Sequence, residues 1–208
     1  MKVLIACEES QTVCKAFRER GHETYSCDIL PCSGGHSEWH IQGDVRSYLN
    51  EGWDMIIAFP PCTHLCSSGA MYWPVKQKDG SQQDAIEFFL CFFKINCKFI
   101  AIENPSGIIS TIFRKPDQYI HPYQFGDPYR KRTGLWLKNL PILIPTNIIK
   151  PVASWHSGST RGGKKKDGTR TKSKLPALHN TGYLRSKTFL GIAQAMATQW
   201  GDYETQPF

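Results

Sequence analysis

A cysteine directly follows two prolines in the segment Phe59-Pro60-Pro61-Cys62-Thr63. The apolar run before it, residues 54–59, is typical of a buried strand. Two prolines stiffen the chain that leaves such a strand, and this fixes the direction of the next side chain. A partly exposed thiol with a lowered pKa is a nucleophile. The segment therefore predicts a nucleophilic Cys62, with a Pro-Pro turn carrying a passive cysteine as the alternative.

A carboxyl group follows a second apolar run. Glu103-Asn104-Pro105 comes directly after residues 99–102, which are also expected to form a strand. A carboxyl in that place can contact a base ring and donate or accept a proton. The alternative is an Asn-Pro turn with a solvated glutamate.

Two arginines alternate in Arg130-Lys131-Arg132. On a strand, residues two apart face the same side, so Arg130 and Arg132 can act together. They could bind a phosphate, or stabilise a thiolate and a carboxylate. The alternative is an exposed edge strand whose charges discourage aggregation.

Strands alternate with helices along the chain. Strands are expected at 2–7, 22–28, 54–59, 99–102 and within 135–143, and helices at about 12–20, 84–94 and 186–200, with a loop over 29–42 and a turn or short helix over 44–49. This alternation predicts an α/β fold with a mostly parallel sheet. Ligands bind beyond the carboxyl ends of such strands. The candidate catalytic and binding residues stand just past those ends, and this recurrence is the strongest indication in the sequence of how the chain is organised.

The 208 residues carry a net charge of +7, and that charge is uneven. Residues 161–174 hold seven Lys or Arg and one acid, which predicts either a polyanion-binding surface or a solvated loop. Residues 150–180 are poor in apolar residues and are expected to form a long mobile loop. Eight scattered cysteines favour the reduced cytoplasm. We see no apolar run long enough for a membrane span, and the early Glu8 and Glu9 argue against a secretory signal.

These segments, in the order in which they occur, resemble those of the cytosine-5 DNA methyltransferases: Pro60-Pro61-Cys62, Glu103-Asn104-Pro105, Arg130/Arg132 and a C-terminal helix. The short form of the chain resembles phage or prophage members of that family. The resemblance implies the Rossmann-like class I methyltransferase fold, with helices on both faces of the sheet. It also implies that Cys62 attacks carbon 6 of cytosine and that Glu103 contacts ring nitrogen 3 and the amino group. Arg130 and Arg132 would support these two groups.

The same resemblance implies S-adenosylmethionine as cofactor. The turn after the first strand would meet its methionine part, although the glycines usual in the family are missing there. Asp28 would bind the ribose hydroxyls, and Asp44 would accept from the adenine amino group. The cofactor-binding residues expected in full are Cys7, Glu8, Glu9, Ser10, Thr12, Asp28, Ile29, Asp44, Val45, Pro60 and Ala195.

The expected substrate is cytosine flipped out of double-stranded DNA. Pro61, Ser67, Ser68 and Asn104 would contact it, and Arg161, Lys164, Lys165 and Arg170 would contact phosphates. Residues 1–149 and 184–208 would form the catalytic domain. Residues 150–183 form a small basic region in place of the family's target-recognition domain, which leaves the recognised sequence open.

Other interpretations remain open. The substrate could be RNA or a free nucleotide, the reaction a related carbon-5 alkylation, or the protein a non-catalytic nucleic-acid binding module. An amino-methyltransferase is a weaker alternative, because those enzymes carry an Asp/Asn-Pro-Pro-aromatic segment instead of residues 59–62. Cys27, Cys32, His36 and His40 have spacings that could suit zinc, although no metal is expected. Cys62 and Cys66 could form a redox pair. The sequence does not predict the oligomeric state.

Overall fold

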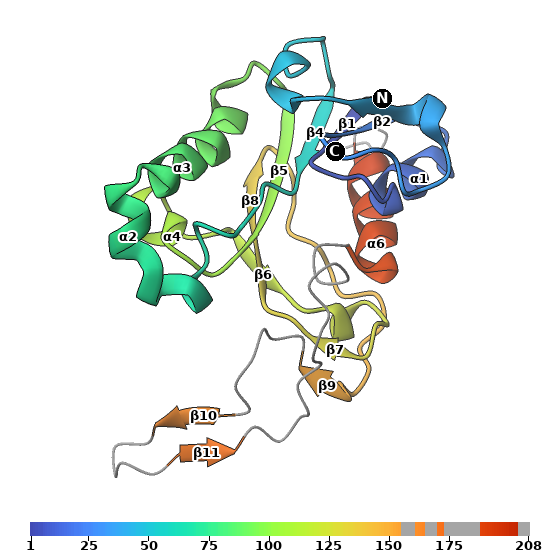
Figure 1. Ribbon diagram of the computed structural model, residues 1–208. Coiled ribbons are helices and arrows are strands. Elements are labelled where there is room, and N and C mark those ends of the chain that lie inside the picture. Colours follow the sequence, from blue (N-terminus) through green and yellow to red (C-terminus); the bar gives the residue numbers. More distant parts are fainter. Residues whose placement is uncertain (155–160, 165–169, 173–187, 204–208) are drawn as a thin grey trace.

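The computed structural model describes residues 1–154, 161–164, 170–172 and 188–203. A seven-stranded sheet with the order β3-β2-β1-β4-β5-β8-β6 forms its centre (Figure 1). Its strands are β1 Lys2–Ala6, β2 Glu23–Asp28, β3 His40–Gln42, β4 Met55–Ala58, β5 Phe99–Pro105, β6 Gln118–Ile120 and β8 Thr133–Lys138. The first five pair in parallel, whereas β8 runs antiparallel to both β5 and β6. The predicted α/β fold with a mostly parallel sheet is therefore confirmed.

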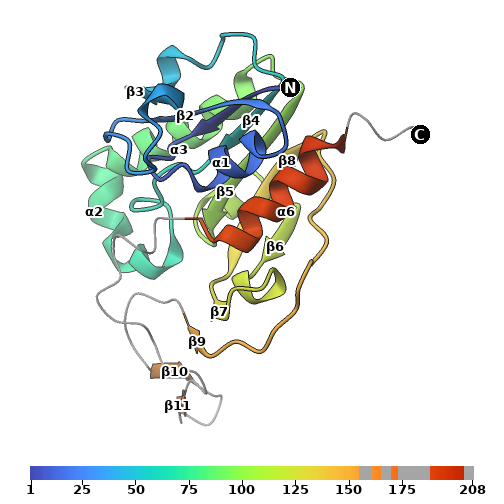
Figure 2. The same cartoon turned by 90° about the vertical axis from the view of Figure 1, so that its right-hand side faces the viewer.

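Helices cover both faces of this sheet (Figures 1 and 2). α1 (Thr12–Arg18) and α6 (Leu190–Gly201) pack on one face, where Phe17, Met196 and Trp200 are fully buried. α3 (Ser81–Cys91) and α4 (Ile109–Ile112) contribute to the core of the other face, and α2 (Trp73–Lys78) packs beside α3. None of the described helices has the length and apolarity needed to cross a membrane.

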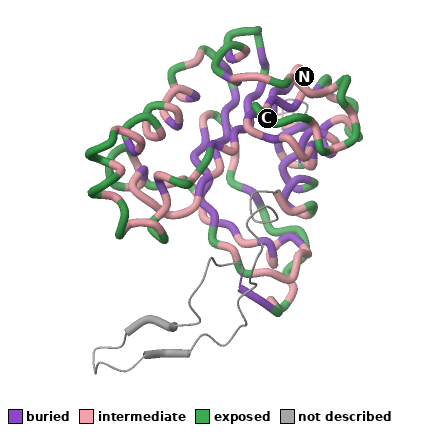
Figure 3. Tube along the Cα trace, viewed as in Figure 1, coloured by how far each residue is buried: buried purple, intermediate pink, exposed green. Residues whose placement is uncertain are grey.

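The central strands are buried on both faces, as Figure 3 shows by the purple trace through the middle of the molecule. All four residues of β4, Met-Ile-Ile-Ala, are buried, and so are the first five of β8. A strand covered on both faces loses the alternation of apolar and polar residues. This is why the uninterrupted apolar runs in the sequence predict these strands. Each buried isoleucine contributes about 1.5–3 kcal/mol to the free energy of unfolding.

The strand order reverses beside β1, whose two neighbours are β2 and β4. In doubly wound sheets such a reversal separates the loops at the carboxyl ends and opens a crevice for ligands. The β1–α1 turn, the end of β2, the loop after β4 and the end of β5 all lie at this edge of the sheet. The fold therefore brings the expected cofactor residues and the expected catalytic residues to the same edge.

Three expectations about the elements need correction. Residues 40–42 form β3 within the segment expected to be a loop. β5 continues through Glu103, Asn104 and Pro105 because these residues pair with β8, which extends beyond β4. The basic region contains an antiparallel pair, β10 (Arg161–Lys164) and β11 (Arg170–Lys172), which lies apart from the sheet in Figure 1. Two further short strands, β7 (Tyr129–Arg130) and β9 (Ala153–Ser154), pair in parallel.

Candidate active site

The loop that carries Cys62 is fixed at both of its ends. Pro60 is buried, and the side-chain amide of Asn104 on β5 donates a 2.8 Å hydrogen bond to its carbonyl oxygen. Beyond Pro61, the backbone N–H groups of Leu65 and Cys66 both donate to the carbonyl oxygen of Cys62, at 3.0 Å. Residues 62–66 therefore form a single helical turn, and Cys62 is half-buried at its start. Asn104 thus supports the loop instead of facing solvent.

Glu103 and Lys131 form an ion pair at the site. Lys131 Nζ lies 3.9 Å from Glu103 Oε1, and the two side chains are only 21% and 19% exposed. Together with Phe59, Thr133, Phe189 and Met196 they line a small pocket. Both charges act on Cys62: Glu103 raises the pKa of its thiol and Lys131 lowers it. A carboxylate in the second half of β5 is therefore paired with an ammonium group, and both charges act on the thiol that follows β4.

The two arginines lie elsewhere. Arg132 stacks over the Tyr119 ring, 3.5 Å from its centroid, and donates a 3.3 Å hydrogen bond to Ser106 Oγ. Arg130 is exposed on β7. Lys131, which stands between them in the sequence, is the residue paired with Glu103. The expectation that the arginines support the thiol and the carboxylate stays a prediction. Arg130 ends β7 and β8 begins at Thr133, so these three residues do not form the single expected strand.

Cys62 and Cys66 interact through their side chains. Ser68 Oγ lies 2.8 Å from Cys66 Sγ, and the two cysteines influence each other's pKa. The Cys62 hydrogen bond, the Ser68 hydroxyl and nearby backbone N–H groups lower the pKa of Cys66 to about 5. The same hydrogen bond, together with burial, raises the pKa of Cys62. Ser67 and Ser68, expected to contact the substrate, are exposed in the same segment.

The β1–α1 turn is tight although it lacks glycine. Cys7 and Gln11 both have left-handed backbone angles, with φ of 61° and 58°. Glu8 points inward, and its carboxylate accepts from the backbone N–H groups of Val13 and Cys14 at 2.7 and 3.1 Å. Burial nevertheless raises the pKa of Glu8 to about 7. Glu8 therefore caps α1, and its side chain is engaged with the protein itself.

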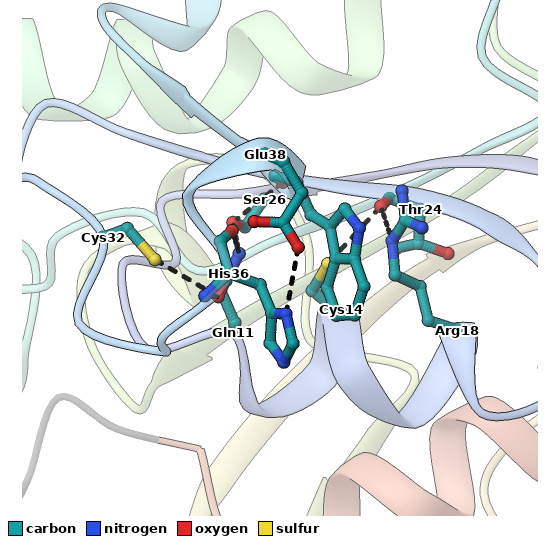
Figure 4. A network of polar contacts seen from close by, with 9 residues as sticks. Gln11, Cys14, Arg18, Thr24, Ser26, Cys32, His36 and Glu38 are labelled. Atoms are coloured by element: carbon teal, nitrogen blue, oxygen red, sulfur yellow. Dashed lines mark hydrogen bonds and ion pairs between the residues drawn. The ribbon is translucent and has the colours of Figure 1, made fainter.

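Gln11 joins this turn to the loop before β3 (Figure 4). Its amide nitrogen donates to His36 O at 2.8 Å and to Ser26 Oγ at 3.3 Å. Its carbonyl oxygen accepts from His36 N at 3.1 Å and from Cys32 Sγ at 3.2 Å. Gln11 is completely buried, and all four of its hydrogen bonds are at least partly buried. Sequence reasoning missed this residue, because nothing in its local pattern indicates burial.

The remaining cofactor candidates lie around this edge of the sheet. Asp28 ends β2 and accepts from Leu30 N at 2.9 Å, and Ile29 beside it is 72% exposed. Asp44 pairs closely with Arg46, whose guanidinium and backbone N–H lower its pKa. The other candidates are engaged locally or buried: Glu9 accepts from Ser33, Ser10 contacts Thr12, and Val45 and Ala195 lie in the core.

These groups fit S-adenosylmethionine in part. An exposed isoleucine beside a carboxylate at the end of β2 suits an adenosine, with Asp28 toward the ribose and Ile29 against the base. Glu8 already occupies the first backbone N–H groups of α1, so the methionine carboxylate would have to meet other donors. Ala195 is only 2% exposed and belongs to the core cluster around α1 and α6.

The basic candidates are only partly covered by the structure. Arg161, Lys164 and Arg170 lie on the β10–β11 pair, while Lys165 and residues 173–187 lie outside the described residues. Over the described part of the chain, no three His, Cys, Asp or Glu side chains gather as a metal site would need. Of the residues considered for zinc, Cys32 bonds to Gln11, and His40 bonds to Ser26 Oγ and Leu30 O.

Comparisons with known proteins find a likeness among solved structures. No family model matches the chain, and no curated protein matches it. A solved structure from Escherichia coli, provisionally assigned as a DNA modification methyltransferase encoded within a prophage, is similar with a TM-score of 0.48 and 16% sequence identity. The match covers 76% of this chain and 58% of that one, so this chain spans little more than half of its length.

Proposed function

We propose that this protein transfers a methyl group from S-adenosylmethionine to carbon 5 of cytosine in DNA. The observation that carries the proposal is the Glu103–Lys131 ion pair, whose two charges act on the Cys62 thiol after β4. The three groups lie beside the edge where a nucleotide cofactor binds in such sheets. A non-catalytic binding module needs no thiol under the influence of a paired acid and base.

The chemistry requires each of these groups. Carbon 5 of cytosine is a poor nucleophile until a thiolate adds to carbon 6 and makes it enamine-like. Cys62 forms that bond, and the electron pair of the ring double bond moves toward carbon 5 and ring nitrogen 3. Glu103 must take up a proton to donate a hydrogen bond to nitrogen 3, and that hydrogen bond stabilises the developing charge. Lys131 holds Glu103 in place and offsets its effect on the thiol.

The cofactor supplies an electrophilic methyl group on a sulfonium when it is bound. Asp28 and Ile29 would hold its adenosine end, and the β1–α1 turn its other end. A water molecule or a side chain not yet identified takes the proton from carbon 5 before the Cys62 sulfur leaves.

The substrate is proposed to be a cytosine flipped out of a duplex, because a stacked base cannot reach a half-buried thiol. The net charge of +7 and the basic run over 161–174 favour a polyanionic partner. Binding to DNA should therefore weaken steeply as salt rises.

The test is transfer of labelled methyl groups to duplex DNA, RNA and dCTP by the wild type and by Cys62→Ser and Glu103→Gln. Cys62→Ser should abolish transfer and Glu103→Gln should lower turnover by about 10²–10⁴-fold, while both variants stay folded. Cys91→Ser, at a half-buried cysteine on α3, is the matched control and should keep full activity. Full activity of Cys62→Ser would end the proposal. Preferred methylation of RNA or dCTP would move the substrate to those classes, and bisulfite sequencing of DNA from expressing cells would identify the methylated sites.

A further inference from the structure

Two cations are bonded to the protein beside the two ends of the turn that carries the proposed nucleophile. Lys76, on α2, donates a 2.6 Å hydrogen bond from Nζ to the carbonyl oxygen of Thr63, near the start of that turn. Arg132 donates to Ser106 Oγ, and the carbonyl oxygen of Ser106 accepts from Ser67 N at 2.9 Å, directly after the turn. One cation is therefore tied to the start of the turn, and the other to the chain segment that pairs with its end.

Both cations keep their charge and spare hydrogen-bond donors. Over the described residues, no ion pair includes Lys76 or Arg132. Asp79, the next acid in the chain after Lys76, accepts from Ser81 N at 2.9 Å. Arg132 is exposed, and its stacking over the Tyr119 ring at 3.5 Å holds the guanidinium plane in a fixed orientation. Each side chain binds a neutral oxygen through one donor, so its remaining N–H groups can bind an anion.

The proposed substrate brings negative charge to this place. A nucleotide that swings out of a duplex carries its two flanking phosphates with it, because it rotates about the backbone to which they belong. The base must enter toward the half-buried Cys62, whereas the phosphates stay at the surface of the turn. Pro61, Thr63, Ser67 and Ser68 are exposed at that surface. Cations bonded beside them therefore stand where the backbone of the flipped nucleotide would lie.

Building on the proposed function, we propose that Lys76 and Arg132 form a phosphate clamp, which holds the DNA backbone on the two sides of the flipped nucleotide. Lys76 binds one phosphate as a point charge, and Arg132 presents its planar fork to two oxygens of another. The contacts are made to phosphates and not to base edges, so the clamp binds the backbone whatever the DNA sequence. Both residues position the substrate and take no part in making or breaking bonds.

The first test measures binding to duplex DNA by fluorescence anisotropy at increasing salt concentration, without cofactor. Each phosphate contact contributes about 0.9 to the slope of log affinity against log salt concentration. Lys76→Gln and Arg132→Gln should therefore each lower the magnitude of this slope by about 0.9, and the double variant by about 1.8. Glutamine keeps a side-chain N–H that can donate to Thr63 O or Ser106 Oγ, so the turn stays supported in these variants.

The controls remove the same charges from the opposite edge of the sheet. Lys2, at the start of β1, also donates to a backbone carbonyl, that of Glu51, at 2.9 Å. Arg20 precedes β2 and forms an ion pair with Asp202. Lys2→Gln and Arg20→Gln should keep the wild-type slope. An unchanged slope in either clamp variant, or an equal loss of slope in the controls, would overturn the proposal.

The second test measures methyl transfer against DNA concentration. Loss of a phosphate contact should raise the DNA concentration at half-maximal rate and leave the rate at saturating DNA unchanged. The reverse result, a lower rate at saturation with an unchanged half-saturating concentration, would also overturn the proposal, because it would place the cation in the chemistry. If the wild type binds duplex DNA but methylates none, the proposed function fails, and the salt slopes still report separately on the clamp. If the wild type binds no duplex DNA, both fail.

Discussion

The side-chain amide of Asn104 donates a 2.8 Å hydrogen bond to the carbonyl oxygen of Pro60, and so joins β5 to the loop that presents Cys62. Asn104 is 1% exposed. Asn104→Ala would leave the Pro60 carbonyl buried without this donor, at a cost of about 1–3 kcal/mol in the free energy of unfolding. We expect this loss in urea denaturation, together with slower methyl transfer. The exposed Asn50→Ala is the control and should stay within about 0.5 kcal/mol; equal stability of both variants would contradict the role of Asn104.

Lys131, and not the arginine on either side, is expected to support the reaction. Lys131→Gln removes the charge that faces Glu103 and Cys62, and should lower the methyl-transfer rate by about 10²-fold. Arg130→Gln is the matched control, because Arg130 is exposed on β7 and carries the same charge. Single-turnover rates on duplex DNA would compare the two. A large loss for Arg130→Gln with little change for Lys131→Gln would return the role to the arginine.

Gly107 permits the chain after β5 to approach the turn of residues 62–66 closely. A Cβ at this position would lie 2.0 Å from Leu65 O and 2.9 Å from Cys66 Cα. Gly107→Ala must therefore displace the turn of residues 62–66, and we expect about 1–3 kcal/mol of destabilisation and slower methyl transfer. Gly69→Ala meets only ordinary contacts, at 3.7 Å or more. If Gly69→Ala destabilised the protein as much as Gly107→Ala, the close approach at Gly107 would not explain the loss of stability.

Stability should fall with rising pH because of Glu8. Burial raises its pKa from 4.5 to about 7 in the folded protein, so the folded state holds this proton more tightly than the unfolded state. The resulting stabilisation is complete below pH 4.5 and is lost as the pH rises to about 7, at most on the order of 3 kcal/mol. Glu8→Gln keeps an acceptor for α1 but cannot ionise. The free energy of unfolding, measured in urea at pH 5 and pH 7.5, should fall more for the wild type than for Glu8→Gln. Parallel changes in the two proteins would count against a buried acid at position 8.

Much of the fold follows from the sequence because the central strands are covered on both faces. Their apolar runs at 54–59 and 99–102 can be recognised without knowing which strands pair with them. The candidate catalytic residues Cys62 and Glu103 follow these runs. β3 could not be predicted in the same way. It has three residues, His-Ile-Gln, none of them fully buried, and it forms only because β2 offers an edge.

The candidate site shows the limit of sequence patterns more sharply. Alternation indicates that Arg130 and Arg132 share a side, but it does not say which side faces Glu103. That choice depends on where β8 starts and on its register with β5, which pairs Thr133 with Pro105. The apolar run that starts at Leu135 could have indicated this register. Cys66 is visible in the sequence as a possible partner of Cys62, but its hydroxyl and amide neighbours appear only in three dimensions.

The left-handed backbone at Cys7 and Gln11 limits how this chain can be improved. An L-residue in that conformation costs about 1–2 kcal/mol relative to glycine. Glycine at position 7 would relieve this cost and remove only a half-buried thiol, so we expect Cys7→Gly to stabilise the protein. Glycine at position 11 would relieve the same cost but would delete the carboxamide that fastens Cys32 and His36. Substitution by glycine is therefore expected to stabilise the protein at position 7 but not at position 11.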